Sequence, residues 1–311
     1  MKFLKLIRYQ NLLLIALMQL VLRYGFLKQQ NVPLTLSDWQ YGLLVLATLL
    51  IAAAGYVIND IMDQETDQTN KPNKVIVGKT ISEDLAYNLY FGLNIAGMLI
   101  GYYLADFVNK TSFFGVFIIS SALLYLYATS LKQIAVIGNV IVALILGLSV
   151  IVVGMFDVLP MMTYVDVELW AKMKVILSIL LDYAIFAFII NLIREIVKDA
   201  QDYEGDNLEG MRTLPIVIGM AKTSKVIFVI GLVATLLLFW YINDNLMENK
   251  LYVAVVYSLV AVVGPMVFFL IKTWSAKTKQ DFALLSTILK FVIFFGILSI
   301  LVITFNIKFN G

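Results

Sequence analysis

Long apolar stretches follow one another along this chain and are separated by short polar segments. Nine of them are long enough to cross a bilayer as helices, and no soluble domain fits between them. They cover residues 10–27, 40–62, 85–105, 112–130, 135–156, 171–196, 223–242, 251–271 and 281–306. Just before the third stretch, Thr80-Ile81-Ser82-Glu83 resembles a capping box at a helix start. The pattern predicts an all-α polytopic membrane protein, a bundle of nine transmembrane helices that forms a single domain over residues 1–311.

Basic residues are distributed unevenly between the alternate loops that these nine spans define. With the N-terminus on the cytoplasmic side, fifteen Lys and Arg residues fall in cytoplasmic segments and six in outer segments, while Arg23 and Lys290 lie within spans. Lys and Arg accumulate in the cytoplasmic loops of membrane proteins. We therefore expect an integral, multi-pass protein of the cell (inner) membrane with its N-terminus in the cytoplasm.

Composition supports the membrane assignment and limits the chemistry. The chain is 61% hydrophobic and 14% charged, with a mean hydropathy of +0.90. It has no Cys and no His, which excludes disulfides, thiolate chemistry, a histidine base and the usual zinc ligands. Any bound metal is then held by oxygen atoms, which favours Mg²⁺, Mn²⁺ or Ca²⁺. A net charge of +2 is too small to indicate a nucleic-acid partner.

Two carboxylate-rich clusters, at residues 59–67 and 194–206, follow the second and the sixth apolar stretch. On a helical projection of ~100° per residue, the Asp residues of the first cluster, together with Asn59, fall within ~100°, and those of the second fall within ~60°. The Asp residues are Asp60, Asp63 and Asp67 in the first cluster and Asp199, Asp202 and Asp206 in the second. Each helix is therefore expected to carry a strip of carboxylates.

Grouped carboxylates are costly at the edge of a bilayer and need a partner, most often a divalent cation. An even number of spans separates the two clusters, so both lie on the cytoplasmic side. Two facing strips would hold Mg²⁺, or Mn²⁺ in its place, with open positions for phosphate oxygens. The alternative is that these are ordinary solvated charges that cap two helices. We favour a site because the helical spacing recurs, because Asn59 and Asn191 open the two faces, and because both clusters share one side.

The first cluster resembles the N-D-x-x-D-x-x-x-D motif of the UbiA superfamily of intramembrane prenyltransferases. The second, which runs on to Thr213-Leu214-Pro215, resembles the second motif of that superfamily. Within the superfamily the chain is most similar to the branch of digeranylgeranylglyceryl phosphate synthases, with chlorophyll synthases nearby. The resemblance covers the whole chain, since these proteins also have nine spans. Many relatives carry a doubled basic-Pro stretch after the first motif, whereas Lys71-Pro72-Asn73-Lys74-Val75 lacks the second Pro.

The resemblance implies a Mg²⁺-dependent transferase that binds a prenyl diphosphate between the two strips. The prenyl tail would lie among the helices or in a lipid-facing portal. A lipophilic acceptor would capture the allylic cation that forms when the diphosphate leaves. All six carboxylates would be catalytic and would bind the metal. The residues expected to bind the substrates are Asn11, Asn59, Lys71, Lys74, Lys132, Asn191, Arg194, Lys198 and Arg212.

Some of these assignments have plain alternatives. Lys132 is equally consistent with a lysine that snorkels to the membrane surface, or with one that only follows the positive-inside bias of cytoplasmic loops. Arg194 has the option of an internal pair with Glu195 or Asp199. Arg8, which with Asn11 resembles a polar pair in the first span of the family, also fits a topology charge.

The resemblance favours a prenylglyceryl phosphate or a similar lipid alcohol as the acceptor. The first rival is an aromatic prenyltransferase of quinone or chlorin biosynthesis. A rival from another class is a transporter of divalent cations or phosphate. A transporter carries polar residues through the middle of the membrane, whereas polarity here gathers at the cytoplasmic edge.

Overall fold

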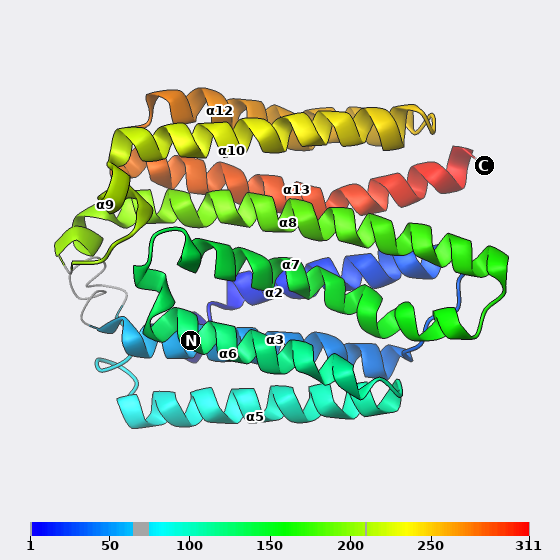
Figure 1. The fold of residues 1–311 in the computed structure, drawn as a ribbon, viewed down its shortest axis with the longest axis horizontal. Helices are drawn as coiled ribbons and strands as arrows, with labels where there is room; N and C mark the ends of the chain where they lie inside the picture. Colours follow the sequence, from blue (N-terminus) through cyan, green and yellow to red (C-terminus); the bar gives the residue numbers. More distant parts are fainter. Residues whose placement is uncertain (1, 65–74, 209, 311) are drawn as a thin grey trace. The chain divides into compact units, whose positions relative to one another are not determined.

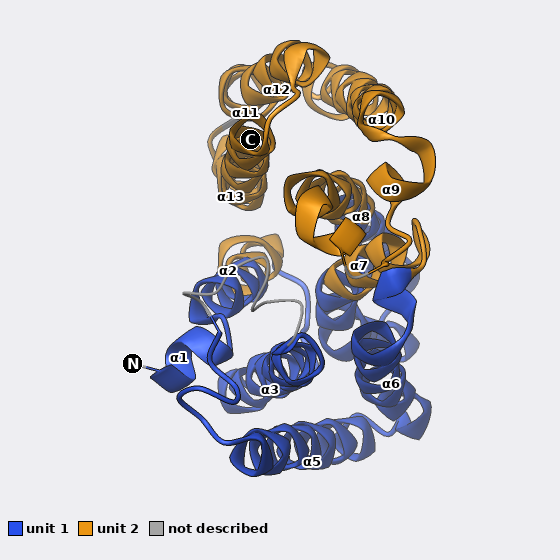
Figure 2. Ribbon diagram, turned by 90° about the vertical axis from the view of Figure 1, so that its left-hand side faces the viewer, with its two compact units in different colours: residues 1–20, 31–133, 147–184 blue, residues 21–30, 134–146, 185–311 orange. Residues whose placement is uncertain are grey.

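A computed structural model describes residues 2–64, 75–208 and 210–310 of the chain. Regular structure in these ranges is helical, apart from two isolated backbone bridges. The chain forms two compact units, which Figure 2 shows in different colours. Unit 1 comprises residues 1–20, 31–133 and 147–184, and unit 2 comprises residues 21–30, 134–146 and 185–311. Each unit carries one of the two carboxylate clusters.

The helices follow the order of the apolar stretches (Figure 1). Their bounds are α1 Lys2–Leu6, α2 Tyr9–Leu20, η1 Val21–Phe26, η2 Leu27–Gln30, α3 Asp38–Met62, α5 Glu83–Phe107, η3 Thr111–Phe114, α6 Gly115–Thr129, η4 Leu131–Gln133, α7 Ile137–Asp157, η5 Leu159–Thr163, α8 Val167–Leu208, α9 Leu214–Ile218, α10 Met220–Tyr241, η6 Ile242–Met247, α11 Tyr252–Ser258, η7 Leu259–Val263, α12 Gly264–Ser275 and α13 Lys279–Asn310.

All nine predicted stretches are helical, which confirms the all-α fold. Among the described residues, eight helical segments are long and apolar enough to cross a membrane. The ninth stretch forms α5, which has 25 residues but falls outside that group of eight. The reason lies in its sequence, where Asn88, Asn94 and several tyrosines lower the mean hydropathy.

Unit 1 is built around α3, which packs against α2, α5 and α6. Small residues allow the close contacts: a Cβ on Gly97 would lie 2.8 Å from Ile51, and a Cβ on Gly101 would lie 2.5 Å from the ring of Phe117. At the C-terminal end of α3, Val57, Ile58 and Ile61 are buried in an apolar cluster with Leu6. This packing fixes the helix turn from which Asp60 and Asp63 extend.

Unit 2 contains α9 to α13 and the C-terminal part of α8. Figure 2 shows α10, α12 and α13 following one another around this unit, and α12 packs against both of the others. The core face of α8 carries Ile193, Ile196, Val197 and Ala200, which are buried in one cluster with Phe269. Their i, i+3, i+4, i+7 spacing is that of one face of a helix. The opposite face of α8 carries the second carboxylate cluster.

The helix starts differ from the predicted capping box. Ser82, not Thr80, is the N-cap of α5, and its hydroxyl accepts a hydrogen bond from the Leu85 backbone N–H. The Thr80 hydroxyl instead donates to the Ile76 carbonyl within the preceding turn. A complete capping box is found at Ser37, the N-cap of α3. The Ser37 hydroxyl accepts from the Gln40 backbone N–H, and the Gln40 side chain accepts from the Ser37 backbone N–H.

Candidate functional site

The first carboxylate cluster lies at the C-terminal end of α3. Asp63 is the C-cap, and its backbone N–H donates to the Asn59 carbonyl at 2.9 Å. The Asn59 side-chain amide donates to Asp63 Oδ2 at 2.6 Å. The i, i+4 spacing places these two side chains one above the other on the helix. Asn59 therefore orients the Asp63 carboxylate, as expected of two residues on one helix face.

Asp60 is paired with the turn between α1 and α2. Arg8 Nη2 donates to Asp60 Oδ1 at 3.0 Å, and the guanidinium lies over the Tyr56 ring at 5.0 Å from its centroid. The Asn11 amide donates to the Tyr56 hydroxyl at 3.2 Å. Desolvation lowers the pKa of Arg8, but the Asp60 carboxylate offsets this effect and leaves the pKa raised. Arg8 and Asn11, the predicted polar pair, thus reach the α3 cluster directly and through Tyr56.

Lys132 reaches the same cluster from a different part of the chain. It lies in η4, after α6, and its ammonium group donates to Asp63 Oδ1. Both side chains are largely buried, with 10% of Lys132 and 16% of Asp63 exposed. A lysine that only marked the membrane topology would extend into solvent. The structure thus pairs Lys132 with Asp63, and its membership of a substrate site stays a prediction.

Three further predicted residues of this cluster, Asp67, Lys71 and Lys74, fall within residues 65–74 and lie outside the described residues. Their assignments stay predictions.

The second cluster lies on α8, which has 42 residues. At 1.5 Å per residue the helix is ~63 Å long, about twice the ~30 Å of hydrocarbon in a bilayer. Its C-terminal turns therefore extend beyond the apolar zone and carry Asp199, Asp202 and Asp206. Of these, Asp206 is buried. Because the three residues lie opposite the buried face of α8, they form the strip that the sequence predicts.

Asn139 of α7 is a member of this second cluster that the sequence analysis missed. It is buried, and its side-chain amide donates to Asp199 Oδ2 at 2.8 Å. Within unit 2, the segment before α7 and the segment after α8 also meet at a backbone bridge between Ile134 and Arg212. That bridge positions Arg212, whose side chain is exposed, at the same end of the unit.

The two basic residues of the second cluster converge on Glu195. Lys198 donates to Glu195 Oε1, and Arg194 Nη1 lies 3.4 Å from the same oxygen. Glu195 is buried, so this arrangement neutralises a carboxylate that would be costly to bury alone. The internal pair of Arg194 with Glu195 is thus present. Asn191 is also buried, and its amide donates to the Ala187 carbonyl of its own helix.

In both units, carboxylates are combined with cations and amides. No group of three acidic side chains close enough to hold a metal ion occurs among residues 2–64, 75–208 and 210–310. Each cluster carries oxygen donors of the kind that a hard cation such as Mg²⁺ prefers, and basic groups of the kind that bind phosphate. Tyr56 and Asn139 were not predicted, because a single Tyr or Asn within an apolar stretch is ordinarily interpreted as a residue that packs between helices.

Comparisons with known proteins agree on one family. The sequence pattern of the UbiA prenyltransferase family matches residues 17–304. A "Digeranylgeranylglyceryl phosphate synthase" of Methanococcoides burtonii is 31% identical over 306 residues, which cover 96% of this chain and 98% of that protein. A protein of the same name from Thermococcus sibiricus is 36% identical over 196 residues, and the match spans only 62% of that relative.

A solved structure shares the fold. A UbiA homolog from Archaeoglobus fulgidus, bound to GPP and Mg²⁺, superposes with a TM-score of 0.59 at 15% identity and covers 96% of this chain and 99% of that one.

Proposed function

The chain belongs to the UbiA prenyltransferase family, and from this premise we propose that it transfers a prenyl group from a prenyl diphosphate to a prenylglyceryl phosphate or a similar lipid alcohol. The match that carries the proposal is the one with the Methanococcoides burtonii synthase, because it runs over nearly the full length of both chains. That relative's name gives a digeranylgeranylglyceryl phosphate as its product, which is the reason for preferring a phosphoglycerol lipid over an aromatic ring.

We propose Mg²⁺ as the cofactor, with Mn²⁺ as a substitute. The residues that would hold it are Asp60, Asp63 and Asp67 with Asp199, Asp202 and Asp206. Their chemistry fits the ion, since Mg²⁺ binds carboxylate oxygens together with phosphate oxygens of a substrate. The related structure with GPP and Mg²⁺ supports the choice. When bound there, the ion would supply positive charge that stabilises the negative charge developing on the diphosphate.

The basic residues have a separate role in this proposal, which is to bind the diphosphate. Lys132 lies against Asp63, and Arg212 lies on the segment that follows α8. Both are proposed to donate to diphosphate oxygens, where they would stabilise the leaving group. The other residues proposed to contact substrate are Asn11, Asn59, Lys71, Lys74, Asn191, Arg194 and Lys198.

Chemically, the proposed reaction breaks the allylic C–O bond of the prenyl diphosphate. The electron pair leaves with the diphosphate, and the allylic carbon becomes cationic. The acceptor hydroxyl oxygen then forms a new C–O bond with that carbon and loses its proton to a carboxylate or to the departing diphosphate. The products are an ether lipid, diphosphate and a proton. The lack of His is consistent with this step, because a carbocation is captured by a weak nucleophile with little help from a base.

Asn139 has a proposed role as a positioning residue. Its amide holds Asp199 Oδ2, so the carboxylate keeps one orientation and presents Oδ1 in a fixed direction. Partners of this kind commonly tune a metal site through the residues that ligate it.

The protein is an integral membrane protein, and we propose that its N-terminus and both clusters face the cytoplasm. The uneven distribution of Lys and Arg supports this orientation.

One experiment separates the proposal from its rivals. Purified protein is incubated with Mg²⁺, a set of prenyl diphosphates and three acceptors: a prenylglyceryl phosphate, a naphthoate and a benzoate. Mass spectrometry should detect a prenylated phosphoglycerol. A prenylated aromatic product would instead support the aromatic class, and ion uptake into vesicles without any product would support a transporter.

A further inference from the structure

Both oxygens of the Asp63 carboxylate in unit 1 accept hydrogen bonds from nitrogen donors of the chain itself. Oδ1 accepts from the Lys132 ammonium group, and Oδ2 accepts from the Asn59 amide at 2.6 Å. The nearby Asp60 accepts from Arg8 at 3.0 Å. The two carboxylates at the end of α3 that are proposed to bind a metal ion are therefore each paired with a positive charge of the protein.

These two cations are held in different ways. The Arg8 guanidinium also lies over the Tyr56 ring, at 5.0 Å from its centroid, and the Tyr56 hydroxyl in turn accepts from Asn11. Among the described residues, Asp63 is the single polar partner of the Lys132 ammonium group. Lysine carries its charge on a flexible four-carbon stem with rotatable donors. Lys132 is therefore the cation that can leave its carboxylate by rotation of its own side chain.

The cluster in unit 2 uses its basic residues differently. Lys198 and Arg194 are paired with Glu195, which is not part of the Asp strip. Asp199 of that strip accepts from the neutral amide of Asn139. These ion pairs in unit 2 thus go to a carboxylate outside the proposed metal ligands, whereas those in unit 1 go to the proposed ligands themselves.

A divalent cation and the Lys132 ammonium group compete for Asp63. Mg²⁺ binds carboxylate oxygens at ~2.1 Å, so an ion on Oδ1 would lie within about 5 Å of an ammonium group that is hydrogen-bonded to the same oxygen. Two positive charges at this separation repel each other. An ammonium group that leaves Asp63 without a new partner is also costly, because only 10% of the Lys132 side chain is exposed. A phosphate oxygen that arrives with the metal ion removes both costs, since it offers the lysine another anion.

We propose that Lys132 is exchanged between two anions, which are Asp63 in one state and an oxygen of the diphosphate in the other. In the first state Lys132 screens the carboxylate from free divalent cations, and in the second it releases the carboxylate to the metal ion. Cation and diphosphate then bind cooperatively, and each raises the affinity for the other by the same factor. The inference rests on the proposed function, from which it takes the diphosphate as the second anion.

The test is the affinity of the purified full-length protein for Mn²⁺ in the absence of any diphosphate, measured by electron paramagnetic resonance. Lys132→Gln removes the charge, and Lys132→Arg retains it. Lys5→Gln is the matched control, because Lys5 is exposed and its neighbour Leu6 is buried against α3 at the same end of unit 1. Lys132→Gln should bind Mn²⁺ at least about five-fold more tightly than the parent, the lower end of usual couplings between ligands. The other two variants should match the parent.

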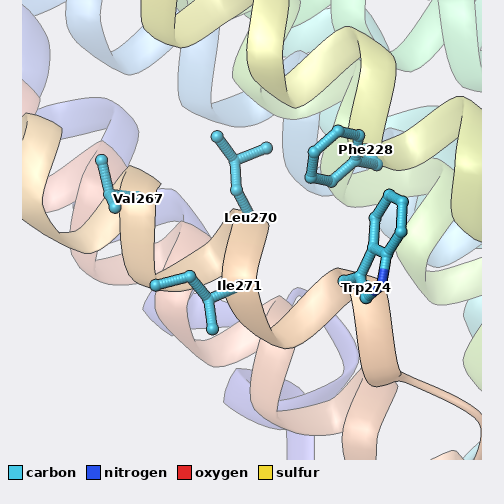
Figure 3. A pocket seen from close by; sticks show the side chains of 5 residues that line it. All are labelled: Phe228, Val267, Leu270, Ile271 and Trp274. Atoms are coloured by element: carbon cyan, nitrogen blue, oxygen red, sulfur yellow. The ribbon is translucent and has the colours of Figure 1, made fainter.

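An apolar groove on unit 2 does not contribute to this measurement. The five residues that line it have no side-chain oxygen (Figure 3); they are Phe228, Val267, Leu270, Ile271 and Trp274. Mn²⁺ prefers carboxylate and carbonyl oxygens as ligands. A change in Mn²⁺ affinity therefore reports on the acidic side chains.

Unchanged or weaker Mn²⁺ binding in Lys132→Gln would overturn the exchange, since Lys132 would then only orient Asp63 or contact the substrate. An equal gain in Lys5→Gln would overturn it as well, because net charge alone would explain the effect. Thermal unfolding in detergent checks that each variant is folded. If Lys132→Gln is not, Lys132→Met, which keeps an unbranched stem without the charge, is measured in its place.

Failure of this inference and failure of the proposed function give different results. Prenyl transfer by the parent, together with an unchanged Mn²⁺ affinity in Lys132→Gln, would refute the exchange alone. Tighter Mn²⁺ binding by Lys132→Gln, together with no prenylated product from the parent, would refute the proposed function and support the competition between Lys132 and the metal ion.

Discussion

At the residue scale, the two clusters show how a charged group is kept at the edge of a membrane. Asp60 and Asp63 each have a cationic partner, Arg8 and Lys132, and Asp199 has the buried amide of Asn139. The sequence predicts the Asp residues because their helical spacing repeats. It does not predict Asn139, since the contact joins residues 60 positions apart and nothing local marks it.

Loss of the Lys132 ammonium group should slow turnover and weaken inhibition by free pyrophosphate. We expect Lys132→Gln to lower kcat/KM roughly 100-fold, a typical loss for a group that stabilises developing negative charge. Steady-state kinetics with and without pyrophosphate measure both effects. Lys110→Gln, at an exposed lysine, is the control and should behave like the parent. Unchanged pyrophosphate inhibition in Lys132→Gln would reduce Lys132 to a structural partner of Asp63.

Removal of the Asn139 amide should weaken metal binding without unfolding the protein. Asn139→Ala is expected to lower the affinity for Mn²⁺, measured by electron paramagnetic resonance, by about 10- to 100-fold. Asn94→Ala is the matched control, because Asn94 is also buried and hydrogen-bonded, to Ser121 in unit 1. The role of Asn139 would be refuted by equal Mn²⁺ affinities in the two variants.

At the scale of elements, the apolar pattern predicts every long helix of the described chain but not its fine structure. It does not predict the π-helical segments η1, η6 and η7. These segments cover residues 21–26, 242–247 and 259–263, and their pattern of apolar and polar residues does not differ from that of the α-helices next to them. It also places the cap of α5 at Thr80, whose hydroxyl is used within the preceding turn. Such choices depend on local hydrogen bonds that hydrophobic spacing does not encode.

Close helix packing in unit 1 should depend on Gly101 of α5. A Cβ at this position would lie 2.5 Å from the Phe117 ring of α6, and Phe117 is itself buried and in contact with Phe156. Since the ring has little room to move, we expect Gly101→Ala to destabilise the protein by ~1–3 kcal/mol, as overpacking does. Thermal unfolding in detergent measures the loss. Gly92→Ala on the same helix, where a Cβ meets nothing within 4 Å, should leave Tm unchanged or raise it.

If Gly101→Ala and Gly92→Ala unfold at the same temperature, close contact between α5 and α6 does not limit stability.

At the scale of the whole molecule, the proposed function needs both carboxylate clusters. The sequence supplies the reason, since its nine predicted spans would separate the clusters by an even number and place both on one side of the membrane. Membership of the UbiA prenyltransferase family supplies the chemistry. The central claim is that both clusters act together, with a divalent cation, in a single prenyl transfer.

The most direct test of this claim is product formation by three variants with and without Mg²⁺. Mass spectrometry follows the prenylated phosphoglycerol made by Asp63→Asn, Asp202→Asn and the control Asp106→Asn, whose side chain is exposed at the end of α5. We predict that EDTA abolishes product in all of them and that Mg²⁺ restores it only in the parent and in Asp106→Asn. Both cluster variants should lose at least ~100-fold in rate while remaining folded. Full activity in EDTA, or parental activity in either cluster variant, would contradict the account.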